Sequence, residues 1–231
     1  MLSVEPGDGF AVVTLERAEK RNALSIELRF ELASALDDLA ADDGVGCAVL
    51  TGAGSAFSSG MDTTQFGGDR ENRMRLLESS ERMFGTVARF PKPLIAAVNG
   101  HALAGGFALA LLCDVRIGSS EARLGFSELA RRHIPPSYAA ARAALPPAAA
   151  RDLCVTGRVL DAAEALALGV LSEVVEPAEL MPRARELGAA IGAGPQAAIE
   201  TKRRVLLEGE RTWMPLLEDE TRVLRNALLG D

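Results

Sequence analysis

Two glycine-containing turns are the segments whose residue types could do chemistry. One covers residues 99–106 and precedes the apolar stretch 107–112, and the other covers residues 52–62 after a short apolar run. At the first turn of a helix the backbone N–H groups have no partner within the helix, so Gly105 and Gly106 offer free donors. Two such turns could aim two N–H groups at one developing oxyanion, as acyl chemistry requires. Taken alone, each turn is explained as well by close packing of small residues.

Other kinds of site are excluded by residue type. The turn at residues 99–106 lacks both the Lys-Ser/Thr pair of a P-loop and the GxGxxG spacing of a dinucleotide-binding fingerprint. No GxSxG elbow presents Ser58 or Ser59 as a nucleophile. The two histidines, His101 and His133, have no cysteine or carboxylate at ligand spacing, so we expect no metal site.

Composition narrows the class of protein and its partners. With 231 residues, of which 48% are hydrophobic and 25% charged, the chain is globular and can bury a sizeable core. A net charge of -7 argues against nucleic acid as a partner. Three widely spaced cysteines without a CxxC pair suit a reducing compartment. Because the N-terminus has no signal pattern and the longest apolar stretch, 102–113, is too short to cross a bilayer, we expect a cytoplasmic protein without a membrane partner.

Strands and helices alternate in the first part of the chain. Ser25 is predicted to cap a helix with leucines at helical spacing, and a second helix is predicted before Pro91. This order predicts an α/β layer. Short apolar runs bounded by Gly, Asp or Pro predict its buried strands at residues 10–15, 47–51, 94–98 and 115–118.

Beyond about residue 137 the pattern becomes mainly helical. Asp161 and Glu164 are spaced as a capping box, and Gly169 is placed to end that helix. One short extended piece is predicted at 171–175. Helices are predicted at residues 137–145, 147–155, 161–168, 195–207 and 216–229.

Four motifs, in their order and spacing, resemble the crotonase superfamily, the enoyl-CoA hydratase and isomerase family. The resemblance runs from about residue 10 to residue 202. It implies repeated ββα units that form a spiral core over residues 1–137, and a helical region at 138–231 that packs homotrimers, often paired into hexamers, within one functional unit. The motifs are Lys20-Arg21-Asn22-Ala23-Leu24, Phe57-Ser58-Ser59-Gly60-Met61-Asp62, Pro91-Lys92-Pro93-Leu94-Ile95-Ala96-Ala97-Val98-Asn99-Gly100 and Cys113-Asp114-Val115-Arg116.

The resemblance also implies a site. The peptide N–H groups of Met61 and Gly105 would form an oxyanion hole for the carbonyl of a coenzyme A thioester. No separate cofactor is implied, because coenzyme A is part of the substrate. Lys20 and Arg21 would lie near the coenzyme A phosphates, unless they form only a solvated turn, and Asp62 is expected to fix its loop. The residues implied to bind substrate are Lys20, Arg21, Ala23, Ser59, Met61, Asp62, Thr63, Thr64, Gly105 and Gly106.

The family hydratases use two glutamates, and this chain has one of them. The first position is occupied by Ala108, and the second is matched by Glu128. Moving a double bond needs one base that removes and returns a proton, so Glu128 suits a Δ3-Δ2 enoyl-CoA isomerase. Without the resemblance, Glu128 is better explained as a surface carboxylate paired with Arg131 or Arg132.

Three functional hypotheses therefore stay open. Isomerisation leads, 2-enoyl-CoA hydration is second, and a non-catalytic acyl-CoA-binding member of the family is third. Lys202 and its two neighbours are expected either to contact phosphate or to form the polar face of their helix. The resemblance further implies that no counterpart follows Leu229 for the last helix with which many members cover the acyl group.

Overall fold

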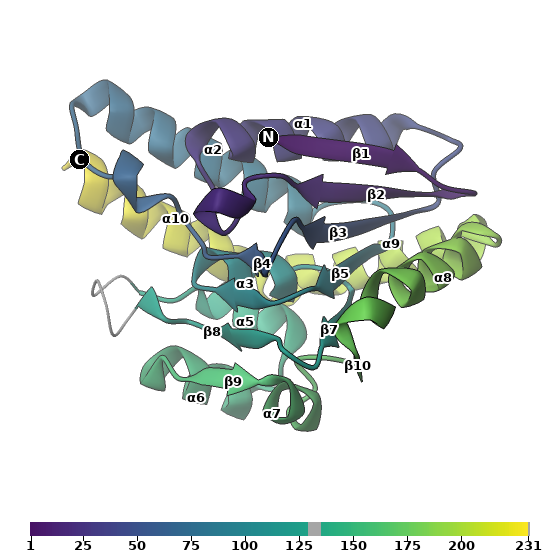
Figure 1. The fold of residues 1–231 in the computed structure, drawn as a ribbon. Coiled ribbons are helices and arrows are strands. Elements are labelled where there is room, and N and C mark those ends of the chain that lie inside the picture. Colours follow the sequence, from purple (N-terminus) through teal and green to yellow (C-terminus); the bar gives the residue numbers. More distant parts are fainter. Residues whose placement is uncertain (129–134, 231) are drawn as a thin grey trace.

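The computed structural model describes residues 1–128 and 135–230, and its two sheets are drawn in Figure 1. Arg131, Arg132 and His133, considered above, lie outside the described residues. The larger sheet has six strands in the order β1-β2-β3-β5-β7-β10, and only β1 runs antiparallel to its neighbour. Its strands are β1 (Leu2–Pro6), β2 (Phe10–Leu15), β3 (Cys47–Gly52), β5 (Leu94–Val98), β7 (Val115–Ser119) and β10 (Glu173–Val175).

The smaller sheet has four strands of three residues each in the order β4-β6-β8-β9. Its strands β4, β6 and β8 are parallel, and β9 is antiparallel to β8. They span β4 (Ala56–Ser58), β6 (His101–Leu103), β8 (Arg123–Gly125) and β9 (Val159–Asp161).

The chain passes from the larger sheet to the smaller one in repeated units. β3 in the larger sheet is followed by β4 in the smaller one and then by α2 (Arg70–Ala88). β5, β6 and α3 (Gly105–Leu111) repeat this path, and β7 and β8 repeat its two strands. The predicted ββα spiral is confirmed, as are the four predicted long strands.

Both faces of the larger sheet are covered, which explains why its strands read as continuous apolar runs. Side chains alternate between two buried clusters, so that Val49 and Leu50 lie on opposite faces. The first face packs against α1 (Ile26–Ala41), whose predicted cap Ser25 accepts a hydrogen bond from Leu28 N. The second face packs against α8 (Leu180–Gly192), a helix that the sequence analysis did not predict.

The remaining helices cluster in the last part of the chain. The capping box of Asp161 and Glu164 is confirmed at the start of α7 (Ala162–Ala167). The last helix, α10 (Met214–Leu229), packs against α2, α5 (Tyr138–Ala144) and α9 (Pro195–Thr212). Figure 1 shows α10 running back across the molecule toward the start of α2. Within the part of the chain that is described, no helix is both long and apolar enough to span a bilayer. These helices are α5 (Tyr138–Ala144), α6 (Pro147–Thr156), α7 (Ala162–Ala167), α9 (Pro195–Thr212) and α10 (Met214–Leu229), with single 3-10 turns at η1 (Ala18–Lys20), η2 (Thr63–Gln65) and η3 (Pro177–Glu179).

Candidate active site

The glycine-containing turn at residues 52–62 fixes the direction of the Met61 amide. Met61 forms an isolated parallel bridge with Leu24, in which Leu24 N donates to Gly60 O at 2.8 Å and Asp62 N donates to Leu24 O at 3.2 Å. Both bonds of Leu24 go to the neighbours of Met61, so the N–H and C=O of Met61 itself point away from Leu24. Gly60 has a φ of 91°, a conformation that favours glycine.

The turn at residues 99–106 fixes the direction of the Gly105 amide. Gly105 is the first residue of α3, so its N–H has no acceptor within the helix. The residue before it, Ala104, has φ 53° and ψ -125°, a conformation that is strained for any residue with a side chain. Ala104 N donates to Gly125 O at 2.9 Å, and Ala104 O accepts from Phe107 N and Ala108 N at 3.0 Å each. These bonds hold the peptide between Ala104 and Gly105 in one orientation.

The two amides border the same small space. A Cβ atom on Gly60 would lie 3.0 Å from Gly105 N, and a Cβ atom on Gly105 would lie 3.6 Å from Met61 N. Among residues 1–128 and 135–230, neither the Met61 nor the Gly105 N–H finds a hydrogen-bond acceptor. Two preset donors around one space are the arrangement that stabilises an oxyanion.

The neighbouring Gly106 has a different role. A Cβ atom on Gly106 would lie 2.3 Å from Ser58 O, so only glycine lets α3 approach β4 this closely. The two explanations of the glycine pair therefore divide between its members. Gly106 serves close packing, and Gly105 leaves an amide open.

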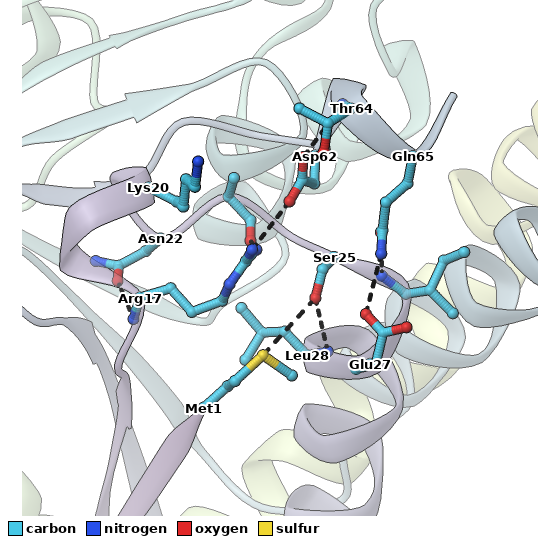
Figure 2. A network of polar contacts seen from close by, with 12 residues as sticks. Met1, Arg17, Lys20, Asn22, Ser25, Glu27, Leu28, Asp62, Thr64 and Gln65 are labelled. Atoms are coloured by element: carbon cyan, nitrogen blue, oxygen red, sulfur yellow. Dashed lines mark hydrogen bonds and ion pairs between the residues drawn. The ribbon is translucent and has the colours of Figure 1, made fainter. Parts of the chain in front are cut away.

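Asp62 fastens the loop that carries Met61, as Figure 2 shows. One carboxylate oxygen accepts from Thr64 N at 3.2 Å and from Thr64 Oγ1 at 2.6 Å, and the other accepts from the Arg17 guanidinium at 3.0 Å. Arg17 also donates to Ala23 O at 2.5 Å. Burial alone would raise the pKa of Asp62, but the bonds from Thr64 and Arg17 outweigh it and lower that pKa. This is the loop-fixing role expected for Asp62.

Asn22 is a functional-site residue whose role the sequence analysis did not predict. It is 0% exposed, and its amide nitrogen donates to Ala53 O at 2.9 Å and to Ala56 O at 2.6 Å. Its side-chain oxygen accepts from Arg17 N at 2.9 Å. Asn22 therefore joins the loop at residues 17–22 to the turn at residues 52–62. Its left-handed φ of 51°, shared by Arg21, is the conformation that asparagine tolerates best after glycine.

The other residues implied to bind substrate divide by exposure. Lys20 and Arg21 are exposed, and their carbonyls accept hydrogen bonds from Ser59 Oγ at 3.5 Å and Ser59 N at 2.9 Å. Thr63 is half-buried and Thr64 is exposed, both in η2, whereas Ala23 is buried. The structure thus brings the basic turn next to the segment that leads into Met61.

Glu128 is half-buried and lies shortly after Gly125, whose carbonyl accepts the hydrogen bond from Ala104 N. Its Oε2 is fully buried and has no hydrogen-bond partner in the described part of the chain. Burial raises the pKa of Glu128 to about 7, against the opposing effect of a backbone hydrogen bond. Three residues earlier, Gly125 accepts from Ala104 N, and the Phe126 ring packs on Phe107 of α3 with 4.8 Å between centroids.

The position of the missing carboxylate is occupied by a methyl group. Ala108 is 4% exposed and lies three residues after Gly105 in α3. Residues three apart lie on the same face of a helix. A side chain here would project from the face that begins with the open amide. With alanine at this position, α3 supplies no acid on that face.

The basic motifs outside the site are structural. Lys92 donates to Leu39 O and Asp42 O at 2.7 and 2.6 Å, which caps the end of α1. Lys202 is 5% exposed and donates to both carboxylate oxygens of Asp114 at 2.7 and 2.8 Å, which joins α9 to the sheet. For Lys202 both expectations were therefore wrong, whereas its neighbours Arg203 and Arg204 are exposed on the polar face of α9. Lys202 is nearly enclosed and paired with Asp114, so it neither forms a solvated face nor is free to bind phosphate.

Comparison with known proteins identifies the family. A family model described as enoyl-CoA hydratase/isomerase matches residues 5–221. The chain belongs to the enoyl-CoA hydratase/isomerase family. A Thermus thermophilus protein named for enoyl-CoA hydratase activity is 39% identical over 214 residues, which cover 90% of this chain and 83% of that protein. The short-chain-enoyl-CoA hydratase of Clostridium acetobutylicum is 32% identical over 208 residues, 86% of this chain and 78% of that protein.

Solved structures of this family share the fold. A crystal structure of an enoyl-CoA hydratase from Mycobacterium avium subsp. paratuberculosis superposes with a TM-score of 0.87 at 26% identity, over 100% of this chain and 94% of that one. A monofunctional enoyl CoA isomerase from M. smegmatis superposes with a TM-score of 0.74 at 30% identity, over 90% and 93% of the two chains. The enoyl-CoA hydratase/isomerase family acts on acyl-CoA thioesters.

Proposed function

We propose that this family member is a Δ3-Δ2 enoyl-CoA isomerase in which Glu128 is the base. One observation carries the proposal. A half-buried carboxylate with a pKa near 7 follows the strand that anchors the open amide of Gly105, while Ala108 supplies no second acid on α3. A base whose pKa lies near the working pH is suited to take a proton and to give it back.

The steps follow from this arrangement. The thioester oxygen accepts hydrogen bonds from Met61 N and Gly105 N, which makes a proton on C2 more acidic. Glu128 takes that proton, and the electron pair of the broken C–H bond enters a dienolate whose negative charge rests largely on the thioester oxygen. The same carboxyl group returns the proton at C4, so the double bond moves from C3–C4 to C2–C3 and Glu128 is again ionised.

The basic turn and the helical region complete the proposal. Lys20 and Arg21 are exposed beside Ser59, where cations can meet the coenzyme A phosphates. The last two helices expose apolar side chains, including Val205, Val223 and Leu224. We propose that the helical region at 138–231 uses such side chains to form a homotrimer, with paired trimers as the larger assembly.

Hydration is the second candidate function, because the relatives named above are mostly hydratases. The purified protein would be given 3-enoyl-CoA and 2-enoyl-CoA in separate reactions. We expect conversion of the first into 2-enoyl-CoA, and slow or no addition of water to the second. Rapid hydration without double-bond migration would reverse this order. Tight thioester binding without turnover of either substrate would favour a binding protein that lost its chemistry.

A further inference from the structure

A buried arginine lies in the first turn of α1, shortly after Leu24, the residue that forms the bridge with Met61. Arg29 of α1 is 0% exposed, and no ion pair joins it to a carboxylate in the described parts of the chain. Burial lowers the pKa of Arg29 to about 10, although Glu27 and Asp62 act in the opposite direction. An unpaired cation in a protein interior is costly, and an apolar side chain of similar length could pack between two helices without that cost. Packing alone therefore does not explain an arginine here.

The bonds of Arg29 join two helices at the start of α1. Its Nε donates to Ser25 O at 3.2 Å, and its Nη1 donates to Leu76 O of α2 at 3.0 Å. The buried Nη2 finds no acceptor in the described segments. The guanidinium thus holds the carbonyl of Ser25 and the backbone of α2 together.

Ser25 connects this bond to the open amide. It directly follows Leu24, whose N–H and C=O form the bridge that turns the Met61 amide outward. The next peptide is held as well, because Ile26 N donates to Gln65 Oε1 at 2.7 Å in the turn that begins at Asp62. Figure 2 shows Ser25, Gln65 and Asp62 together at this junction. The path from Arg29 to the Met61 amide consists of fixed backbone.

We propose that Arg29 is a positioning residue for the oxyanion hole, which holds Leu24 and Ser25 against α2 so that the Met61 amide keeps its direction. Arg29 acts on the thioester oxygen only through Leu24 and Met61. The inference rests on the oxyanion hole of the proposed function. It predicts an effect on the polarisation of the thioester carbonyl, which a merely structural residue would not produce.

The experiment compares Arg29→Met with Lys92→Met. Lys92 is the matched control, because it is also a buried cation that donates to two backbone carbonyls, but at the far end of α1. The probe is a cinnamoyl-CoA thioester labelled with 13C at the carbonyl, and the readout is its C=O stretching frequency by infrared difference spectroscopy. For Arg29→Met we expect a smaller shift of that frequency on binding, a kcat about tenfold lower and a KM changed by less than about twofold. For Lys92→Met we expect the wild-type shift and kcat with a lower melting temperature.

A folded Arg29→Met protein with the wild-type shift and kcat would overturn the inference. If Arg29→Met does not fold, Arg29→Gln takes its place, because its amide can reach one of the two carbonyls but not both. A wild-type shift in folded Arg29→Gln would overturn the inference equally.

The same probe separates this inference from the isomerase proposal, because it needs thioester binding and no turnover. A wild-type protein that polarises the carbonyl but moves no double bond would contradict only the isomerase proposal. A wild-type protein that binds the thioester without any shift would remove the oxyanion hole, and Arg29 with it.

Discussion

The amide pair and the Glu128 carboxylate differ in how firmly hydrogen bonds hold them in place. Around Met61 and Gly105, hydrogen bonds fix the neighbouring backbone groups of Leu24, Gly60, Asp62 and Ala104. Glu128 keeps a buried oxygen without a partner among the residues described. Fixed dipoles stabilise a developing charge without moving, whereas a base must change its protonation state, which is easier for an oxygen that no donor holds in its ionised form. The proposed mechanism therefore combines rigid donors with a carboxyl group that keeps one oxygen without a partner in the portion of the chain that is described.

Removing the acid should have the largest effect. Glu128→Gln preserves the shape of the side chain but cannot accept the C2 proton, so we expect isomerisation to fall by about 10³-fold or more. Thioester affinity should stay within about twofold, because the amides are unchanged. The measurement is exchange of the C2 proton in deuterated water, and the exposed Glu121→Gln is the control. Undiminished exchange in Glu128→Gln would remove Glu128 from the mechanism.

Crowding the donors should have the next largest effect. A Cβ atom on Gly105 meets Met61 only at ordinary contact distances of 3.4 to 3.7 Å, so Gly105→Val should fold. Its side chain would begin beside the space between the two amides, and kcat/KM should fall by about 10²- to 10³-fold. Gly194→Val is the control, because a Cβ atom there meets nothing within 4 Å. Equal activity of the two variants would mean that the thioester oxygen binds elsewhere.

A pH profile should separate the two halves of the site with the smallest change. Because the pKa of Glu128 is raised to about 7 and the base acts as a carboxylate, kcat/KM should fall about tenfold per pH unit below 7 and level off above it. The backbone amides do not titrate in this range. A profile of kcat/KM without a limb near pH 7 would assign the removal of the C2 proton to another group.

The raised pKa of Glu128 also predicts how the stability of the protein depends on pH. The contribution of Glu128 to stability is greatest below its unfolded pKa of 4.5 and is lost as the pH rises through about 7. The melting temperature of Glu128→Gln should therefore exceed that of the wild type at pH 8 and match it near pH 4.

Most strands of the larger sheet were predictable from the sequence, including the short β10, whereas β1 and the strands of the smaller sheet were not. Phe10–Leu15 and Leu94–Val98 are buried on both faces, so nearly all their residues are apolar and the run itself predicts the strand. The strands of the smaller sheet have three residues each, too few to show a period. β6 lies within the segment that the sequence analysis interpreted wholly as a turn.

The site divides in the same way. Glycines that permit close approach are visible in a sequence, and so Gly105 and Gly106 were found. The direction of the Gly105 amide depends on Ala104, whose positive φ comes from bonds to distant residues rather than from its own type. Arg29 could not be predicted, because a charged residue on an amphipathic helix ordinarily faces water. Only the partner helix α2 reveals that Arg29 is enclosed.

The strain at Ala104 has a consequence for how the protein uses its ligand. Glycine would adopt the same backbone angles freely and would also leave them freely, whereas alanine reaches them only because the folded chain imposes them. The cost of alignment thus falls on the folding of the polypeptide and not on the encounter with a thioester. Under the proposed function, even a loosely bound thioester meets a donor that is already aligned with its oxygen, so the rate need not depend on tight binding.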